Sequence, residues 1–561
     1  MRRTLAVLVS VVAILGLLGP PAFAQAPAPA PKVTINGLLD FVTTMYKNST
    51  GEAGGTGATT QARDVTTSRD KGWYSRERGV FTITGEVGRS KGVLALEFDF
   101  HNGHTTQNFQ DAGFGGDSGL DAETDEKNQV EVKWLYLETP ITGAGSLMPF
   151  IPVTSIGRFG GQPASGIDYK PGILFTGDFP GVTLTTTWAP NLRSTLFYTQ
   201  IEEALDRVNN PPGNGGFKVA DNWGIGAAAE VDVFKGLTVK PTYVYFFCKG
   251  GCQSSTGNRS NNPVGTANGT GVFARGGFDP GSGTGAQAGG QATLLHERHT
   301  LGGDVRWTAG PWSLQPTFLY QFGKQQVRPA NNDKADDSVD IRAYIFDVIG
   351  GFRTGPLSLE GRVLYTPGMK IKDCVDRIAG VCGGGNTIHY YEPLMQGTAA
   401  YWAGWSEIEG SGIDYNLSLR SPGSGAQLGR SPSYDKYGRI ALGAAGDYSL
   451  TPALTFHAVT IFQWAAEKVD RGSRALTTST GGGGISLQPV GSDTTSRFLG
   501  HEWDLGLTYR FAPNVAFDLI GAVLFVGEAR DTARTVAANP SGAIKEAQDA
   551  YKLSARVRVT W

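Results

Sequence analysis

Apolar and polar residues alternate with period two in three segments near the end of the chain. These segments are Leu499–Phe511, Asn514–Glu528 and Tyr551–Trp561. In the last segment one face carries Tyr551, Leu553, Ala555, Val557, Val559 and Trp561, and the other carries Lys552, Ser554, Arg556, Arg558 and Thr560. Successive side chains of a β-strand point to opposite faces, so the pattern predicts strands with one apolar and one polar face.

The same alternation recurs from Val33–Tyr46 onward, for example in Val80–Val87 and Val93–Phe100. A soluble β-sandwich could show it too, but a second sheet would have to cover the apolar face. Because the pattern recurs along the whole chain and the chain ends on an aromatic residue in a strand, it favours a transmembrane β-barrel. The apolar face would contact lipid and the charged face an aqueous lumen.

Short and long connections alternate along the chain. Turn-forming residues mark tight turns at 189–191, 235–236, 309–311, 354–356, 451–452 and 512–514. Long loops are expected at about 103–128, 161–178, 203–219, 249–295, 324–338, 368–392, 421–436, 468–498 and 529–550. This asymmetry is typical of outer-membrane barrels, whose turns are periplasmic and whose long loops are extracellular.

We therefore predict an all-β fold, a single antiparallel up-and-down transmembrane barrel of about 18 strands (range about 16–20). The count is 18 if residues 396–420 belong to loops and 20 if they form a hairpin. Either number is even, which leaves both termini in the periplasm. A barrel this wide is not filled by the side chains of its own strands, so its interior is expected to hold water unless loops fold inward.

The first 24 residues have the features of a secretory signal peptide. Arg2 and Arg3 are basic, residues 5–18 are apolar, and Ala22-Phe23-Ala24 is a cleavage site of small residues. Residues 25–32 form a Pro/Ala-rich lead-in, and residues 33–561 form the barrel. No later apolar run reaches the roughly 18 residues of a membrane-spanning helix.

Composition fits this interpretation and excludes some partners. Charged residues make up 18% of the chain and aromatic residues 10%. The formal net charge is −2, and removing the two arginines of the signal peptide makes it −4. Such a weak bias does not indicate nucleic-acid binding.

Four cysteines fall in two close pairs, Cys248 with Cys252 and Cys374 with Cys382. Each pair lies in a Gly-rich loop of an exported chain, which favours two local disulfides, although four cysteines permit three pairings. The spacing does not match the usual metal or haem motifs.

The alternation also predicts which charged side chains face the lumen. The candidates are Asp40, Glu86, Glu97, Asp99, Glu131, Lys133, Arg158, Asp304, Arg306, Arg342, Glu360, Arg362, Arg439, Asp447, Glu502, Asp504, Arg510, Asp518, Lys552, Arg556 and Arg558. Some would pair across strands and brace the wall, and others would set the selectivity of a constriction. Eleven acids against ten bases predict weak ion preference.

Aromatic residues recur near strand ends, as in the interfacial girdles of membrane barrels. The candidates are Tyr46, Trp134, Tyr136, Trp188, Tyr198, Trp307, Trp312, Tyr365, Tyr448 and Trp561. An ordinary aromatic core would collect such residues as well.

Three stretches resemble large Gram-negative outer-membrane porins, especially the alginate-export-like group of 18-stranded barrels. They are Asn128–Pro140 followed by residues 155–162 (Ser-Ile-Gly-Arg-Phe-Gly-Gly-Gln), residues 499–528, and the aromatic-ended 557–561. Together they cover about a quarter of the chain. The last is similar to the terminal signal by which the assembly machinery recognises outer-membrane barrels. The alginate exporter has a strongly basic lumen, whereas the lumen expected here is mixed, which argues against alginate as the substrate.

The sequence offers little for catalysis. The pairs His101/His104 and His296/His299 have a spacing of three, but both are expected at loop–strand junctions, where surface histidines are more common than metal ligands. No Gly-x-Ser-x-Gly elbow or phosphate-binding loop is present. We expect no enzymatic activity, no metal and no cofactor.

The expected function is passive diffusion of small hydrophilic solutes or ions through an outer-membrane channel. The alternatives are an adhesin or scaffold barrel and an exporter of a polysaccharide such as alginate. A TonB-dependent transporter would need an N-terminal plug, and only about eight residues precede the first expected strand. A conduit sheathing multihaem cytochromes would need more strands. The expected partners are outer-membrane lipid, the barrel-assembly machinery through Trp561 and a small solute. The sequence leaves open whether the barrel is a monomer or a trimer, and loop 249–295 is the expected constriction.

Overall fold

The structure is a computed structural model of the 561-residue chain. It describes residues 30–48, 71–102, 130–163, 167, 169–170, 172–174, 178–203, 221–249, 292–328, 337–368, 387–391, 393, 405–410, 412–413, 432, 437–470, 476–478, 485–487, 495–530, 532–533, 544–545 and 548–561. The expected signal peptide and all but the end of the lead-in lie outside these residues.

Eighteen long strands make up most of the described chain. They are β1 (Lys32–Lys47), β2 (Lys71–Val87), β3 (Ser90–Asn102), β4 (Val130–Pro140), β5 (Thr154–Pro163), β6 (Asp178–Ala189), β7 (Leu192–Glu203), β8 (Asp221–Phe234), β9 (Leu237–Lys249), β10 (Ala292–Ala309), β11 (Trp312–Arg328), β12 (Asp337–Thr354), β13 (Leu357–Thr366), β15 (Arg439–Ser449), β16 (Leu454–Asp470), β19 (Thr495–Ala512), β20 (Val515–Val526) and β23 (Ala550–Thr560).

The shorter elements connect these strands. They are β14 (Thr387–Ile388), β17 (Leu476–Thr478), β18 (Ile485–Leu487), the 3₁₀-helix η4 (Glu528–Arg530), β21 (Thr532–Ala533) and β22 (Ile544–Lys545). No helix among the described residues has the length and apolar character needed to cross a membrane.

The long strands close into one antiparallel barrel. Each pairs with its neighbours in the chain, and β1 pairs with both β2 and β23, which closes the ring. β14 only adds a short parallel pairing to β12, because β13 pairs directly with β15. The predicted 18-stranded all-β barrel is therefore confirmed. The described residues within 396–420 form no strand, in agreement with the count of 18.

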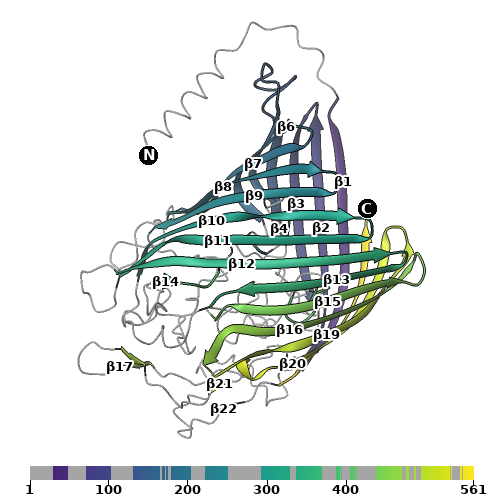
Figure 1. The fold of residues 1–561 in the computed structure, drawn as a ribbon. Coiled ribbons are helices and arrows are strands. Elements are labelled where there is room, and N and C mark those ends of the chain that lie inside the picture. Colours follow the sequence, from purple (N-terminus) through teal and green to yellow (C-terminus); the bar gives the residue numbers. More distant parts are fainter. Residues whose placement is uncertain are drawn as a thin grey trace.

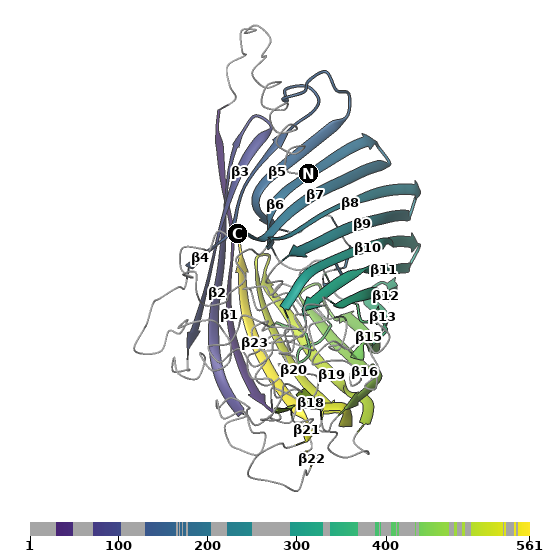
Figure 2. The ribbon, with the colours of Figure 1, turned by 90° about the vertical axis from the view of Figure 1, so that its left-hand side faces the viewer.

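The strands are strongly tilted, so strands on opposite walls cross. Figures 1 and 2 show β1–β4 running steeply across the direction of β10–β12. Closure of a sheet into a barrel requires such a tilt. The short turns β10–β11 and β12–β13 lie together at one end of the barrel (Figure 1), with glycine in the left-handed region at Gly310 and Gly355. The predicted alternation of short and long connections is present between the described strands.

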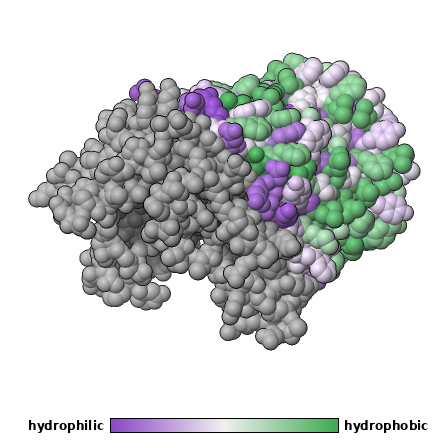
Figure 3. Space-filling model, turned by 90° about the horizontal axis from the view of Figure 1, so that it is seen from below, coloured by the Kyte–Doolittle hydropathy of each residue, from purple (hydrophilic) through white to green (hydrophobic). Residues whose placement is uncertain are grey.

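The outward face is apolar, as the period-two pattern predicts. Large hydrophobic residues are exposed on it around the barrel, for example Phe41, Leu135, Leu196, Phe318 and Leu505. Figure 3 shows apolar residues over much of the visible wall, with smaller hydrophilic patches between them. The buried residues lie on the opposite face, toward the barrel interior, and they include both charged and apolar side chains.

Candidate functional site

The inner wall carries ion pairs between neighbouring strands. Asp40 of β1 lies opposite Arg558 of β23, and Arg558 Nε donates to Asp40 Oδ1 at 2.5 Å. On the next strand, Asp518 accepts from Arg556 Nε at 2.9 Å and from the Thr508 hydroxyl at 2.6 Å. The four charged residues were predicted to face inward from the alternation, and their side chains meet on the inner face.

Two groups of three charges continue the pattern around the wall. Glu138 of β4 accepts from Arg158 of β5 at 2.5 Å and lies 2.9 Å from Lys91 of β3. Glu97 of β3 pairs with Arg78 of β2 and, at 2.5 Å, with Lys133 of β4. In each group one acid is shared by two bases on neighbouring strands.

In these pairs the base is more exposed than the acid. The side chain of Arg558 is 35% exposed and that of Asp40 is 0%. Arg158 is 31% exposed against 13% for Glu138, and Lys133 is 21% exposed against 6% for Glu97. The short carboxylates lie against the strands, and the longer basic side chains extend past them into the interior. The water-facing surface of this part of the wall is therefore more positive than a count of charges suggests.

A segment between β5 and β6 folds into the barrel and packs on its wall. We call its described residues, 167, 169–170 and 172–174, the first inner segment. The Nζ of Lys170 in this segment lies 2.6 Å from Oδ1 of Asp347. Oδ2 of the same carboxylate accepts from Arg362 Nε at 2.9 Å. All three side chains are buried. Burial lowers the pKa of the Lys170 ammonium, and the Asp347 carboxylate opposes that shift.

Tyr169 fixes the first inner segment to a second group of strands. Two cations lie against its ring, with the Lys240 Nζ 4.5 Å and the Arg306 guanidinium 3.8 Å from the ring centre. Its hydroxyl donates to Glu230 at 3.0 Å. Burial and the Glu230 carboxylate raise the pKa of the Tyr169 hydroxyl, which keeps it a donor. The two cation–π contacts hold the ring in place.

A second segment, between β13 and β15, also lies against the inner wall. We call residues 405–410 and 412–413 the second inner segment. Glu502 accepts from the Ser406 hydroxyl at 2.7 Å and from the Ile408 amide at 2.8 Å, and Asp504 accepts from the Glu407 amide at 3.0 Å.

Two basic residues of the wall hold the same segment. Lys552 Nζ donates to the Glu407 carbonyl at 2.8 Å, and Arg439 lies 3.4 Å from Glu409. Glu502, Asp504, Lys552 and Arg439 were predicted lumen residues. The structure places all four under the second inner segment, where they are buried.

The two inner segments create an apolar patch on the inner wall that the sequence analysis did not predict. Ile167, Ile173 and Leu174 of the first segment and Trp405 of the second form one buried cluster with wall residues, including Ala343 and Ile345. Tyr391 joins this cluster, and its hydroxyl donates to the Ile173 carbonyl at 2.7 Å. These contacts join residues far apart in the chain, so no local periodicity could reveal them.

Arg342 is the candidate that the structure corrects. Its side chain is 63% exposed, whereas its neighbours Ile341 and Ala343 are buried on the inner face. Arg342 lies opposite Phe322, which is exposed on the outer face. The prediction that it faces inward is wrong, because the inner face of β12 is apolar here. Arg342 pairs with Asp340 near the loop end of β12 instead.

Two aromatic residues of β4 also face the interior rather than the outer girdle. The β3–β4 register shifts between Ala95 and Leu96, after which Trp134 lies opposite the buried Ala95. Lys133 Nζ lies 5.9 Å from the Trp134 ring centre, and Arg158 lies 5.7 Å from that of Tyr136. A bulge inserts one residue and reverses the faces that simple alternation assigns. Other girdle candidates are exposed on the outer face, among them Trp188, Tyr198, Trp312, Tyr448 and Trp561.

The remaining candidates are placed by contact or register. Asp304 is buried and accepts from Thr317 and from the Tyr169 amide. Asp447 pairs with His457 at 2.7 Å. Glu86 lies opposite Lys91, Glu360 opposite Gly351, and Arg510 opposite Ala516. For Asp99 and Glu131 the structure describes only the backbone, which places them opposite Arg78 and Glu97.

The proposed disulfides and the expected constriction are not covered by the described residues. Cys252, Cys374 and Cys382 lie outside them, as does the side chain of Cys248. Residues 250–291, most of the loop expected to form the constriction, are also outside. Within the described part of the chain, no three His, Cys, Asp or Glu side chains are arranged to hold a metal ion.

Comparisons with known proteins give only structural matches of low sequence identity. No family model matches the chain, and no curated protein matches it. Among solved structures, OpdQ of Pseudomonas aeruginosa is 10% identical with a TM-score of 0.42, over 95% of this chain and 97% of that one. OccK8 (OprE) of the same organism is 10% identical with a TM-score of 0.42, over 94% and 98%. OccAB4 of Acinetobacter baumannii is 7% identical with a TM-score of 0.41, over 94% and 98%.

Proposed function

We propose that this protein is an outer-membrane channel through which small hydrophilic solutes cross passively. The observation that carries the proposal is the closed 18-stranded ring with an apolar outer face and water-exposed charges on its inner face. Hydrocarbon tolerates a backbone only where every hydrogen bond is made internally, which a closed barrel achieves. Exposed side chains such as Leu135 and Leu505 would then contact lipid.

The two inner segments are the proposed constriction. The first is fixed to β8–β10 through Tyr169 and to β12–β13 through Lys170, and the second is fixed to β19 and β23. They cover one side of the inner wall. The wall formed by β23 near Arg558 and by β1–β5 would face the solute path, with its ion pairs between Arg558 and Asp40 and between Arg158 and Glu138.

The exposure of the ion pairs favours anionic solutes. Acids and bases are nearly equal in number among the predicted lumen residues, which by itself predicts weak preference. Selectivity depends on the charges that an ion meets in water, and most of these are basic here. Lys240 and Lys552 do not contribute because the inner segments cover them, and two exposed acids of the inner wall, Asp447 and Glu360, reduce the preference. We infer a modest preference for anions.

Swelling of proteoliposomes tests the channel directly. Vesicles containing the refolded mature chain should swell in an isotonic solution of a small sugar, and vesicles containing the heat-unfolded chain should not. Absence of swelling with every small solute would favour an adhesin or scaffold barrel. Entry of a long polysaccharide as fast as that of a small sugar would favour the exporter.

A further inference from the structure

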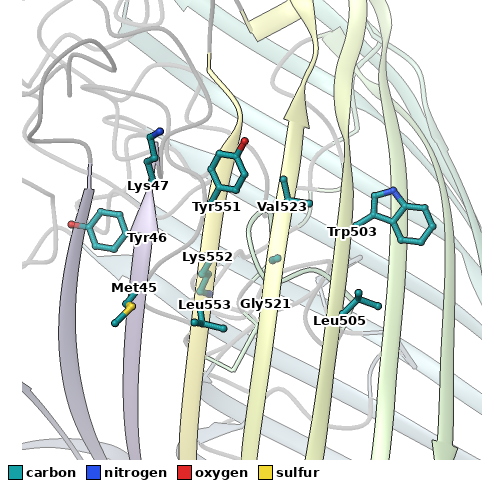
Figure 4. Close-up of a pocket in the computed structure, with 11 residues that line it drawn as sticks. Met45, Tyr46, Lys47, Trp503, Leu505, Gly521, Val523, Tyr551, Lys552 and Leu553 are labelled. Carbon is teal, nitrogen blue, oxygen red and sulfur yellow. The ribbon is translucent and has the colours of Figure 1, made fainter.

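The outer wall has an apolar groove near the loop end of the barrel. It spans β1, β23, β20 and β19, is shallow and open to the surface, and has a volume of about 510 Å³. Figure 4 shows the side chains of Met45, Leu553 and Leu505 around the position of Gly521, where no side chain fills the surface.

The strand register explains the groove. Met45 lies opposite Leu553, Leu553 opposite Gly521, and Gly521 opposite Leu505, so the four residues form one row across four strands. Only Gly521 lacks a side chain in that row. A Cβ added at Gly521 would meet nothing closer than the Leu553 Cδ1 at 3.7 Å, so the space beside it is open.

The next row toward the loop end carries a positive charge. Here Lys47 lies opposite Tyr551, which lies opposite Val523 and then Trp503. Lys47 Nζ lies 5.9 Å from the centre of the Tyr551 ring. Lys71 of β2 is the register partner of Lys47, so two lysines occupy adjacent positions at this edge.

We propose that this groove binds a phosphorylated glycolipid of the outer leaflet, the lipid A part of lipopolysaccharide. One acyl chain would occupy the space beside Gly521, and a phosphate would lie against Lys47. The proposal rests on the proposed outer-membrane location, which places the loop end at the outer leaflet. Lipid tails are as apolar as leucine, so burial alone cannot select a ligand here. Shape at Gly521 and charge at Lys47 must do so.

The test is native mass spectrometry of the full mature barrel in detergent, titrated with bis-phosphorylated lipid A. The wild type should retain one lipid A molecule. Gly521→Leu should abolish retention because its side chain fills the groove. Lys47→Gln should weaken retention about five-fold, which corresponds to roughly 1 kcal/mol for one lysine near an anionic lipid surface.

Matched variants separate binding from folding. Gly350 also faces outward, and a Cβ added there would contact only the Leu314 Cδ1 at 3.8 Å, so Gly350→Leu should retain lipid A. Lys235 lies exposed in a turn at the other end of the barrel, and Lys235→Gln should also retain it. All four variants should migrate as folded barrels in unheated gels.

Several results would overturn the proposal. One is retention of lipid A by Gly521→Leu. The others are that the wild type retains lipid A lacking both phosphates, or phosphatidylglycerol, as well as it retains bis-phosphorylated lipid A. A dimer of the wild type that Gly521→Leu converts to a monomer would show instead that a second copy covers the groove. Solute flux through Gly521→Leu should equal that of the wild type. Absence of flux in both proteins, with lipid A still bound to the wild type and not to Gly521→Leu, would contradict the proposed function and leave the lipid site intact.

Discussion

The ammonium of Lys170 lies 2.6 Å from a carboxylate oxygen of Asp347, and both side chains are buried between the first inner segment and the barrel wall. The pair joins residues 177 positions apart. Asp347 also accepts from Arg362, so one acid holds a basic residue of the wall and one of the segment. This contact makes the first inner segment part of the barrel's folded interior.

Removing this contact should widen the solute path. Lys170→Met eliminates the ammonium but leaves Asp347 paired with Arg362, so the wall keeps its own ion pair. Loss of one partner of a buried pair costs about 3–5 kcal/mol when the other charge is left without a partner. The cost should be lower here because Arg362 still pairs with Asp347. We expect a larger single-channel conductance and a lower urea midpoint of unfolding. The exposed Lys235→Met is the control, and unchanged conductance in Lys170→Met would show that the segment does not restrict the path.

Tyr169 should act mainly through its ring. Tyr169→Phe removes the hydrogen bond to Glu230 but keeps the contacts with Lys240 and Arg306, so its stability should fall by only about 1 kcal/mol. Tyr169→Ala removes all of them and leaves a cavity, so it should cost about 3–5 kcal/mol. Chemical unfolding of both variants in detergent measures the difference. Equal losses would assign the role to the hydroxyl.

Glu502 should fix the second inner segment. Its carboxylate accepts from Ser406 and from the amide of Ile408, and a buried donor without a partner costs about 1–3 kcal/mol. Glu502→Leu should therefore lower stability by a few kcal/mol and increase the fluctuations of channel current. Glu360→Leu is the control on the same inner wall, because Glu360 is exposed. A quiet Glu502→Leu channel with normal conductance would contradict the proposed role.

Anion preference should depend on the exposed arginines of the inner wall. Arg158→Gln leaves Glu138 paired with Lys91 and should lower the anion-to-cation permeability ratio about two-fold, as expected for one partly screened charge. Arg342→Gln should not change the ratio, because Arg342 faces outward. Reversal potentials under a salt gradient measure both variants. A change in the Arg342 variant equal to that in the Arg158 variant would contradict the assigned faces.

The fold could be predicted from the sequence because period-two alternation is local. Each strand carries its own apolar and polar faces, and turn residues such as Gly355 mark where strands reverse. The alternation also placed Asp40 and Arg558 on the inner face, although they are 518 positions apart, because each belongs to a clearly alternating strand. That they pair with each other could not be predicted from local alternation, because it depends on the pairing of β1 with β23 that closes the barrel.

The errors arose where local alternation does not determine the face. In β4 a bulge turns Trp134 and Tyr136 inward. In β12 the inner face carries apolar residues such as Ile345, which pack on the inner segments. The alternation rule expects charged residues on the inner face, so it assigned Arg342 to the wrong side. The inner segments themselves depend on contacts such as Tyr391 with Ile173, across 218 positions. No spacing within either segment reveals such a partner.

The most direct test of the channel is single-channel recording in planar bilayers with the purified mature protein. We predict a steady open conductance at low voltage and, under a potassium chloride gradient, a reversal potential displaced toward the chloride equilibrium potential. Absence of conductance at every voltage would contradict the account, and a displacement toward the potassium equilibrium potential would contradict its electrostatic part.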